Sequence, residues 1–198
     1  MILLQEALAG FRTMPLLEWL AVLFGVAYVV LAAKESLWAW FFAFWGTLIY
    51  TILFWEGSLI SSFLLNIYYM VMAIYGFVLW GKKSRKDEVR IHRIGVQKAL
   101  RLFISFGFLS LVLGYLFGRY FAANEPYLDA FVFTLSLAAT YMMAKKVLEN
   151  WLFWIVVDSA GIVLYYKSGY YPTVVLFSLY VGLGIYGYFE WRKLEQVR

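Results

Sequence analysis

The sequence contains no cysteine and a single histidine, His92. The lack of cysteine excludes disulfide bonds, iron–sulfur clusters and thiolate metal sites. One imidazole with no second histidine or thiolate does not make a zinc or haem site. We therefore expect neither a metal nor a cofactor in this protein.

Charged residues are also scarce. Only 15% of the 198 residues are charged, whereas 64% are hydrophobic; soluble domains usually carry about 25% charged residues. A soluble chain of this length leaves much of its surface in water and cannot hide so much apolar surface in one core. The composition excludes a soluble enzyme, a disordered chain and a nucleic-acid-binding protein, and it indicates an all-α membrane protein.

Long apolar runs make up most of the chain. A membrane-spanning helix needs about 20 apolar residues, and seven runs of this kind are separated by short turns. The one long polar segment, residues 81–101, contains eight of the 17 Lys and Arg residues. The predicted spans are residues 16–33, 37–55, 58–80, 100–121, 128–144, 149–166 and 170–190.

The N-terminal residues 1–15 lack the basic region and cleavage site of a signal peptide. Apolar residues at helical spacing within them, from Leu3 to Phe11, favour a short helix at the membrane interface. With seven spans, 14 of the 17 basic residues fall on one side of the membrane and three on the other. The positive-inside rule then predicts an external N-terminus, a cytoplasmic C-terminus, and a basic segment beside anionic lipid headgroups.

Two parts of the sequence resemble each other. Residues 74–80 (IYGFVLW) match residues 185–191 (IYGYFEW) at an offset of 111, which also places Tyr180 opposite Tyr69. The segment LFWEG, ending at Gly57, matches YYKSG at an offset of 112, so one inserted residue is needed. Three spans alone would turn the second copy upside down, and the fourth span restores its direction. This predicts a parallel 3+1+3 repeat, an arrangement in which transporters hold substrate at the repeat interface.

The predicted organisation follows from these spans and the repeat. It consists of an N-terminal segment (1–15), a first three-helix repeat (16–80), a basic cytoplasmic segment (81–99), a linker transmembrane helix (100–121), a second three-helix repeat (128–191) and a cytoplasmic tail (192–198).

Asp158 is the one acidic residue that we place in the middle of a span, a position that usually marks a solute or ion pathway. Trp151 and Trp154 precede it by seven and four residues, so the three side chains share one helix face. Two indoles and a carboxylate suit a flat cationic ring through stacking, cation–π attraction and counter-charge. The alternatives are interfacial tryptophans and an aspartate that hydrogen-bonds a neighbouring helix.

Asn66 is the matching polar residue in the first repeat, and its amide suits a hydroxyl or a carboxamide. Tyr69 follows it by one helical turn, and Tyr69 with Tyr180 would close a pocket from both sides. The alternatives are an interhelical hydrogen bond for Asn66 and ordinary aromatic packing for the two tyrosines.

The segment ENWLFWIVVD (149–158) resembles the W-x-x-W-x-x-x-N/D signature of the PnuC family of vitamin transporters. The segments LYYKSGY (164–170) and GYFEWRK (187–193), and the Tyr-Gly…Trp end of the first repeat, are also similar, so the resemblance covers about residues 16–193. It implies a fold like that of the SWEET sugar transporters, in the bacterial inner membrane. It allows a homotrimer.

The resemblance also implies a function, which is uptake of a B-type vitamin or its riboside by facilitated diffusion, with a cytosolic kinase trapping the product. Carried over by motif, Trp151, Trp154 and Asp158 become substrate-binding residues, joined by Asn66 and Tyr69. The family name points to nicotinamide riboside. Close relatives carry thiamine, with which we associate an aspartate at position 158, and a carboxylate suits either cation.

Other functions remain as alternatives. Asp158 could carry a proton, which would make the protein a proton-coupled vitamin transporter. A membrane protein without transport activity is the second alternative. An enzyme is not expected, since the sequence has no Walker motif, histidine pair or G-x-S-x-G motif.

Overall fold

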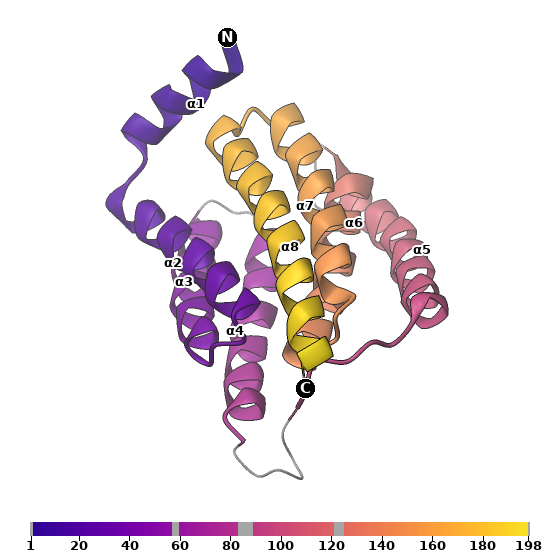
Figure 1. The fold of residues 1–198 in the computed structure, drawn as a ribbon. Helices are drawn as coiled ribbons and strands as arrows, with labels where there is room; N and C mark the ends of the chain where they lie inside the picture. The colour runs from indigo at the N-terminus through magenta and orange to yellow at the C-terminus, as the bar shows by residue number, and fades with distance from the viewer. Residues whose placement is uncertain (1, 57–59, 83–88, 121–124, 198) are drawn as a thin grey trace.

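The computed structural model describes residues 2–56, 60–82, 89–120 and 125–197. The described residues form eight α-helices (Figure 1). The predicted turn at Gly57, the middle of the basic segment and part of the loop before the fifth predicted span lie outside the described residues. The helices are α1 (Ile2–Thr13), α2 (Leu16–Ala33), α3 (Trp38–Glu56), α4 (Ile60–Trp80), α5 (Val96–Tyr120), α6 (Pro126–Ala144), α7 (Asn150–Lys167) and α8 (Tyr171–Val197).

Six of the described helices are long and apolar enough to cross a membrane: α2, α3, α4, α5, α6 and α8. The prediction of an all-α membrane protein is therefore confirmed. Helix α7 has the same length as α2, but Asn150, Asp158 and Lys167 lower its mean hydropathy. The count of seven spans and the orientation of the termini stay predictions.

Two helix ends differ from the predicted ones. Helix α5 begins at Val96, one turn earlier than predicted, and α8 continues to Val197. Residues 192–197, which the sequence analysis assigned to the cytoplasmic tail, are thus part of α8. The extension has a physical cause, because Trp191 is completely buried and Arg93 forms an ion pair with Glu195 in the last turns.

The helices pack as two three-helix units. Helix α3 lies against α2 and α4 in the first unit, and α7 lies against α6 and α8 in the second. The units meet where α2 packs on α8 and where α4 packs on α6, while α5 packs on α6 and α1 on α8 (Figure 1). Each unit thus contributes its first and last helices to the boundary with the other.

Residues that are 111 positions apart make matching contacts in the two units. The Trp40 ring lies directly over Gly76, and the Trp151 ring lies directly over Gly187. A Cβ atom at Gly187 would lie 2.6 Å from the indole of Trp151, so each contact requires a glycine. The same packing solution therefore occurs twice in the chain.

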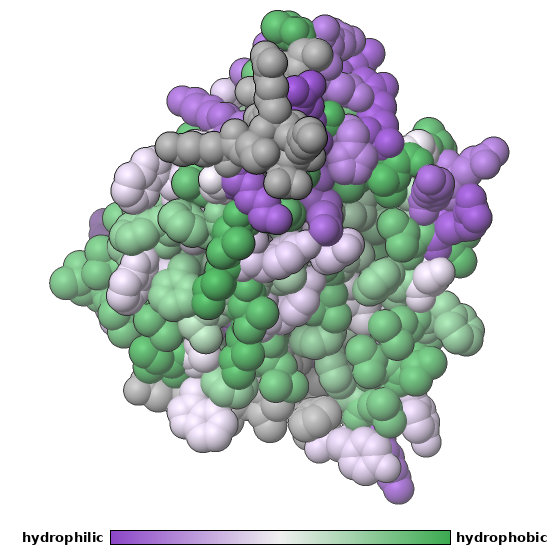
Figure 2. Space-filling view, turned by 90° about the horizontal axis from the view of Figure 1, so that it is seen from below, coloured by the Kyte–Doolittle hydropathy of each residue, from purple (hydrophilic) through white to green (hydrophobic). Residues whose placement is uncertain are grey.

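We call the end of the bundle where α2 and α6 end and α3 and α7 begin the basic end, since Lys34, Lys145 and Lys146 lie there. The C-terminus lies at this end, which is at the bottom of Figure 1. Seen from this end, hydrophilic side chains gather on one side of the molecule, and hydrophobic side chains cover much of the remaining surface (Figure 2).

Candidate functional site

A cavity of about 790 Å³ lies between the two units. This volume is in the range of pockets that bury a small organic ligand, about 300–1,000 Å³. Its wall is built from α2, α3, α4, α6, α7 and α8, with smaller contributions from α1 and α5. All six residues that the sequence predicted for the site line this cavity: Asn66, Tyr69, Trp151, Trp154, Asp158 and Tyr180. Their role in binding stays a prediction.

The stripe on α7 faces the cavity as one surface. Trp151 and Asp158 are buried, and Trp154 is half-buried. The Trp154 ring lies against Tyr69 of α4, with ring centroids 6.2 Å apart, so this contact crosses from one unit to the other. Within the described part of the chain, the Asp158 carboxylate receives no hydrogen bond and forms no ion pair. A buried carboxylate without a partner is costly, and a bound cation would remove that cost.

The two tyrosines related by the repeat make matching contacts across the boundary. Tyr69 of α4 has its hydroxyl close to the Ser136 side chain of α6. The Tyr180 hydroxyl of α8 lies directly against Gly25 of α2. Gly25 and Ser136 are themselves 111 residues apart, so each tyrosine reaches the first helix of the other unit at the equivalent position.

Asn66 uses only part of its hydrogen-bonding capacity. Its Nδ2 group donates to the Ser62 carbonyl oxygen at 2.9 Å, within α4. Among the described residues, none donates a hydrogen bond to its Oδ1 atom. Asn66 therefore keeps an acceptor on the cavity wall, and it does not make the interhelical hydrogen bond that was the alternative explanation.

The charge of the cavity wall has one sign. Four acidic residues line it, Glu18, Glu125, Asp129 and Asp158, and none of the described lining residues is Lys, Arg or His. Glu125 pairs with Lys167 at 2.9 Å. Glu18 and Asp129 lie in the first turns of α2 and α6, at the end opposite the basic end. A wall of this kind attracts cations and repels phosphate groups.

Three indole N–H groups on the wall lack partners. The Nε1 atoms of Trp40, Trp151 and Trp154 are buried, and no described residue accepts a hydrogen bond from them. Buried donors are nearly always satisfied in folded proteins. Acceptor atoms of a bound solute would satisfy them here.

Three cavity residues were missed by sequence reasoning. Trp40 is buried on the wall and precedes Trp151 by 111 residues, so the repeat itself was a signal that could have found it. Ser136 and Thr140 of α6 are also buried on the wall. Their spacing of four residues in an apolar span was a weaker signal.

The cavity also bears on the register of the repeat. Lining residues of α3 and α7, such as Leu53 and Leu164, follow an offset of 111, so the one-residue insertion assumed from the sequence is not needed there.

Tryptophans close the cavity toward the basic end. The rings of Trp40, Trp80, Trp191 and Trp151 form a chain with successive centroid distances of 5.2, 6.1 and 5.5 Å. The two central rings also bond across the units. Trp80 Nε1 donates to the carbonyl oxygen of Ala144 on α6 at 2.9 Å, and Trp191 Nε1 donates to that of Ala32 on α2 at 3.0 Å.

A buried ion pair joins the two units beside these rings. Lys146 Nζ lies 2.6 Å from Glu35 Oε1, both side chains are less than a tenth exposed, and the ammonium lies 4.8 Å from the Trp80 ring centroid. Glu35 and Lys146 are 111 residues apart, and both have a positive φ, 57° and 55°, that non-glycine residues rarely adopt. The pair and the tryptophan chain together hold the units in contact at the basic end.

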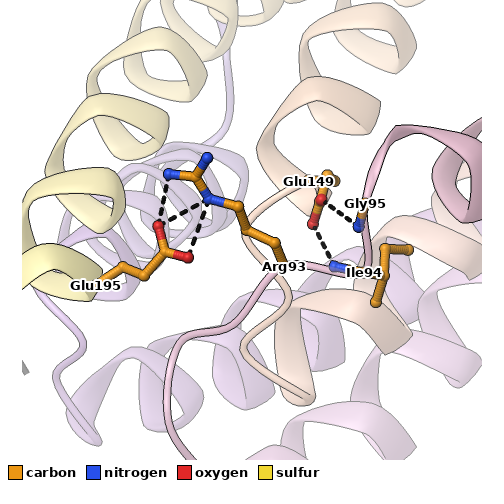
Figure 3. A network of polar contacts seen from close by, with 5 residues as sticks. All are labelled: Arg93, Ile94, Gly95, Glu149 and Glu195. Carbon is orange, nitrogen blue, oxygen red and sulfur yellow. Dashed lines mark hydrogen bonds and ion pairs between the residues drawn. The ribbon is translucent and has the colours of Figure 1, made fainter.

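The segment before α5 is tied to the same end (Figure 3). The Glu149 carboxylate accepts hydrogen bonds from the backbone N–H groups of Ile94 at 3.2 Å and Gly95 at 2.9 Å. Arg93 forms an ion pair with Glu195 of α8 at 2.7 Å. The hydrogen bond to Glu195 raises the pKa of the exposed Arg93 guanidinium. Residues 93–95 therefore connect the turn between α6 and α7 to the end of α8.

Metal ligands are not grouped in the parts of the chain that the structure describes. No set of three or more His, Asp or Glu side chains there is placed to hold a metal ion.

Comparisons with known proteins agree with this architecture. The family model described as nicotinamide mononucleotide transporter matches residues 15–193. The nicotinamide riboside transporter PnuC of Escherichia coli (strain K12) is 22% identical, over 92% of this chain and 87% of that protein. The riboflavin/roseoflavin transporter RibM of Streptomyces davaonensis is 27% identical, over 84% and 80%.

A solved structure is similar over nearly the whole chain. It is the crystal structure of the vitamin B3 transporter PnuC, which matches with a TM-score of 0.74 at 23% identity. The match covers 98% of this chain and 88% of that one, and it shows a shared fold. The relatives named here are transporters, which confirms the expectation that the chain is not an enzyme.

Proposed function

This chain belongs to the nicotinamide mononucleotide transporter family, and we propose that it carries nicotinamide riboside across the membrane by facilitated diffusion. The resemblance to the PnuC family is confirmed, and the chain is a vitamin transporter that crosses the bacterial inner membrane several times. The substrate, the transport mechanism and the site residues are the parts that we propose.

The single observation that carries the proposal is the unpaired Asp158 carboxylate beside Trp154, on a cavity wall with four acids and no base among its described residues. Nicotinamide riboside contains a permanently charged pyridinium ring. That ring can stack on the Trp154 indole while its charge faces Asp158. Desolvation in the cavity strengthens the attraction between the two charges.

The same wall discriminates among the solutes that related transporters carry. Nicotinamide mononucleotide adds a phosphate group, which the four acids would repel. Riboflavin, the substrate in the name of the 27% identical relative, is neutral and would leave Asp158 unpaired in a desolvated site. Thiamine is a cation with an aromatic ring, so it satisfies the same electrostatic condition and is the competitor to test.

We also propose the parallel 3+1+3 arrangement, with α5 as the linker helix, an external N-terminus and a cytoplasmic basic end. The matching contacts of Trp40 with Gly76 and of Trp151 with Gly187 support the repeat. The excess of Lys and Arg at the basic end supports the orientation. In this arrangement the cavity is closed toward the cytoplasm by the tryptophan chain and by the Glu35–Lys146 pair.

Transport then requires the two units to separate at the basic end while they approach each other at the opposite end. The Glu35–Lys146 pair and the two Trp-to-carbonyl bonds are the contacts that this movement breaks. Net uptake is completed by a cytosolic kinase that phosphorylates the vitamin and so prevents its return. Assembly as a homotrimer, which the family resemblance allows, is part of this proposal.

Titration calorimetry of the detergent-purified protein tests the substrate. We expect saturable binding of nicotinamide riboside and no binding of nicotinamide mononucleotide or riboflavin. Trp154→Ala should lower the affinity for nicotinamide riboside about 100-fold, since stacking and cation–π attraction in a desolvated site contribute about 2–3 kcal/mol. The control is Trp45→Ala, which removes a half-exposed tryptophan of α3 that lies outside the cavity wall. Binding of thiamine without the riboside would overturn the substrate assignment.

Proteoliposome uptake separates the two transport mechanisms. A facilitator equilibrates nicotinamide riboside across the membrane, and an imposed pH gradient does not change the final internal concentration. Accumulation above the external concentration, driven by that gradient, would instead support the proton-coupled alternative, with Asp158 as the protonated group.

A further inference from the structure

We infer that Ser136 and Thr140 of α6, with Asn66 of α4, form a wall that binds the ribose hydroxyls of the substrate. The inference rests on the proposed function, because it assigns part of the same cavity to a particular part of nicotinamide riboside. It adds two residues that neither the sequence pattern nor the family motif points to.

The first argument compares two parts of the cavity wall that occupy equivalent places in the repeat. One lies where α4 meets α6 and the other where α2 meets α8, and they differ in polarity. Where α4 meets α6, the wall carries Asn66, Ser136 and Thr140. The residues 111 positions away, where α2 meets α8, are Phe177, Gly25 and Val29, and all six line the cavity. The second wall shows that the fold packs without polar groups at these positions. A functional reason is therefore needed for the polar groups of the first wall.

The second argument is that the polar wall keeps unused acceptors. Ser136, Thr140 and Asn66 are only 1%, 4% and 7% exposed. The Thr140 hydroxyl donates to the Ser136 carbonyl oxygen at 2.7 Å, and Asn66 Nδ2 donates to a carbonyl oxygen of its own helix. The Thr140 hydroxyl and one N–H of Asn66 are thus occupied within the helices, while lone pairs remain on Thr140 Oγ1 and Asn66 Oδ1. Ribose hydroxyls are donors that match such acceptors.

The third argument is position. The ring of Tyr69 contacts Trp154, and its hydroxyl lies close to the Ser136 side chain. Tyr69 therefore lies between the Ser136 and Thr140 hydroxyls of α6 and the α7 face that carries Trp154 and Asp158. In nicotinamide riboside the ribose is joined directly to the pyridinium nitrogen. A ring stacked on Trp154 beside Asp158 would place the ribose next to Tyr69 and the α6 hydroxyls.

The test compares nicotinamide riboside with its 2′,3′-dideoxy analogue, which keeps the cationic ring and lacks both ring hydroxyls. In the unmodified protein we expect the riboside to bind at least tenfold more tightly, as expected when hydroxyls lose buried partners. In Ser136→Ala combined with Thr140→Val, the ratio of the two affinities should fall toward one, because the riboside loses two of its three proposed partners while the analogue loses none. Both substitutions keep the helix and nearly the same side-chain volume.

The matched control is Thr134→Val, which removes a buried hydroxyl of the same helix that lies outside the cavity wall. It should leave the ratio unchanged. A ratio near one in the unmodified protein, or the same large ratio in the double variant, would overturn the inference while the proposed function stands. Failure of the unmodified protein to bind nicotinamide riboside would instead overturn the proposed function, and the inference with it.

Discussion

The basic end and the cavity wall differ in how closely the two three-helix units resemble each other. At the basic end, residues 111 positions apart are identical or make the same contact: tryptophans meet glycines, and tryptophan N–H groups bond the opposite unit. On the cavity wall, several equivalent positions carry different chemistry, although the tryptophans at 40 and 151 and the tyrosines at 69 and 180 are identical. The differing pairs are Ala43 and Trp154, Thr47 and Asp158, Asn66 and Phe177, Gly25 and Ser136, and Val29 and Thr140.

This difference separates packing from binding. The two units pack with the same helix geometry at the basic end, so the same residue types fit the contact in each unit. A small organic cation has no twofold symmetry, so a wall that recognises it has to differ between the two units. Five of the residues that we assign to the substrate depart from the repeat: Asn66, Ser136, Thr140, Trp154 and Asp158. Trp151, Tyr69 and Tyr180 follow it, so these three positions serve both units alike.

Positions 35 and 146 are equivalent in the repeat, yet they carry opposite charges and form an ion pair. Breaking this pair should have the largest effect on stability. Lys146→Met removes the ammonium that pairs with the buried Glu35 carboxylate, and breaking a buried ion pair from one side costs about 3–5 kcal/mol of stability. Thermal unfolding of the detergent-purified variant measures the loss. In the control Lys193→Met, an exposed ammonium is removed from a surface pair worth at most about 1 kcal/mol.

The double variant Glu35→Met, Lys146→Met sharpens this result. Replacing both charges by apolar groups removes the cost of desolvation together with the attraction, so most of the lost stability should return. If Lys146→Met were as stable as the unmodified protein, the pair would contribute nothing to the contact between the units.

Asp158→Thr makes the two units alike at a binding position, since Thr47 is the equivalent residue. It removes the carboxylate from the cavity, so the affinity for nicotinamide riboside should fall about tenfold, because the pyridinium charge loses the opposite charge that it faces. Titration calorimetry measures the change. Asp158→Asn keeps the shape of the side chain and removes its charge. A full affinity in Asp158→Thr would show that the substrate does not use this residue.

Gly187→Ala tests the repeated tryptophan–glycine contact and should have the smallest effect. The added methyl group meets the Trp151 ring, so we expect a loss of about 1 kcal/mol, at the low end of the cost of overpacking. Gly182→Ala in the same helix meets no atom within 4 Å and should stabilise the helix by up to about 1 kcal/mol. Equal melting temperatures for the two variants would contradict the close contact.

Much of the candidate site could be predicted from the sequence because its residues lie on single helices with regular spacing. The spacing of Trp151, Trp154 and Asp158 places them on one face of α7, and the cavity lies on that face. The repeat offset paired Tyr69 with Tyr180, and these tyrosines do make equivalent contacts. The same offset would have identified Trp40 had it been applied to Trp151.

Other features could not be predicted because they depend on which helices are neighbours. Ser136 and Thr140 are ordinary small polar residues of an apolar span until α4 packs on α6 and places them beside Asn66. The full length of α8 is a further example. The apolar run stops near Glu190, whereas the helix, with Trp191 buried, continues to Val197.

The sequence by itself determined that the chain is a membrane protein, where most of its apolar helices lie, and which two segments resemble each other. These properties depend on composition, local periodicity and direct comparison of residues within one chain. The tertiary structure decided which helices touch: it set Lys146 against Glu35 and Tyr69 against Ser136. Such contacts join residues far apart in sequence, and only the packing of whole helices brings them together.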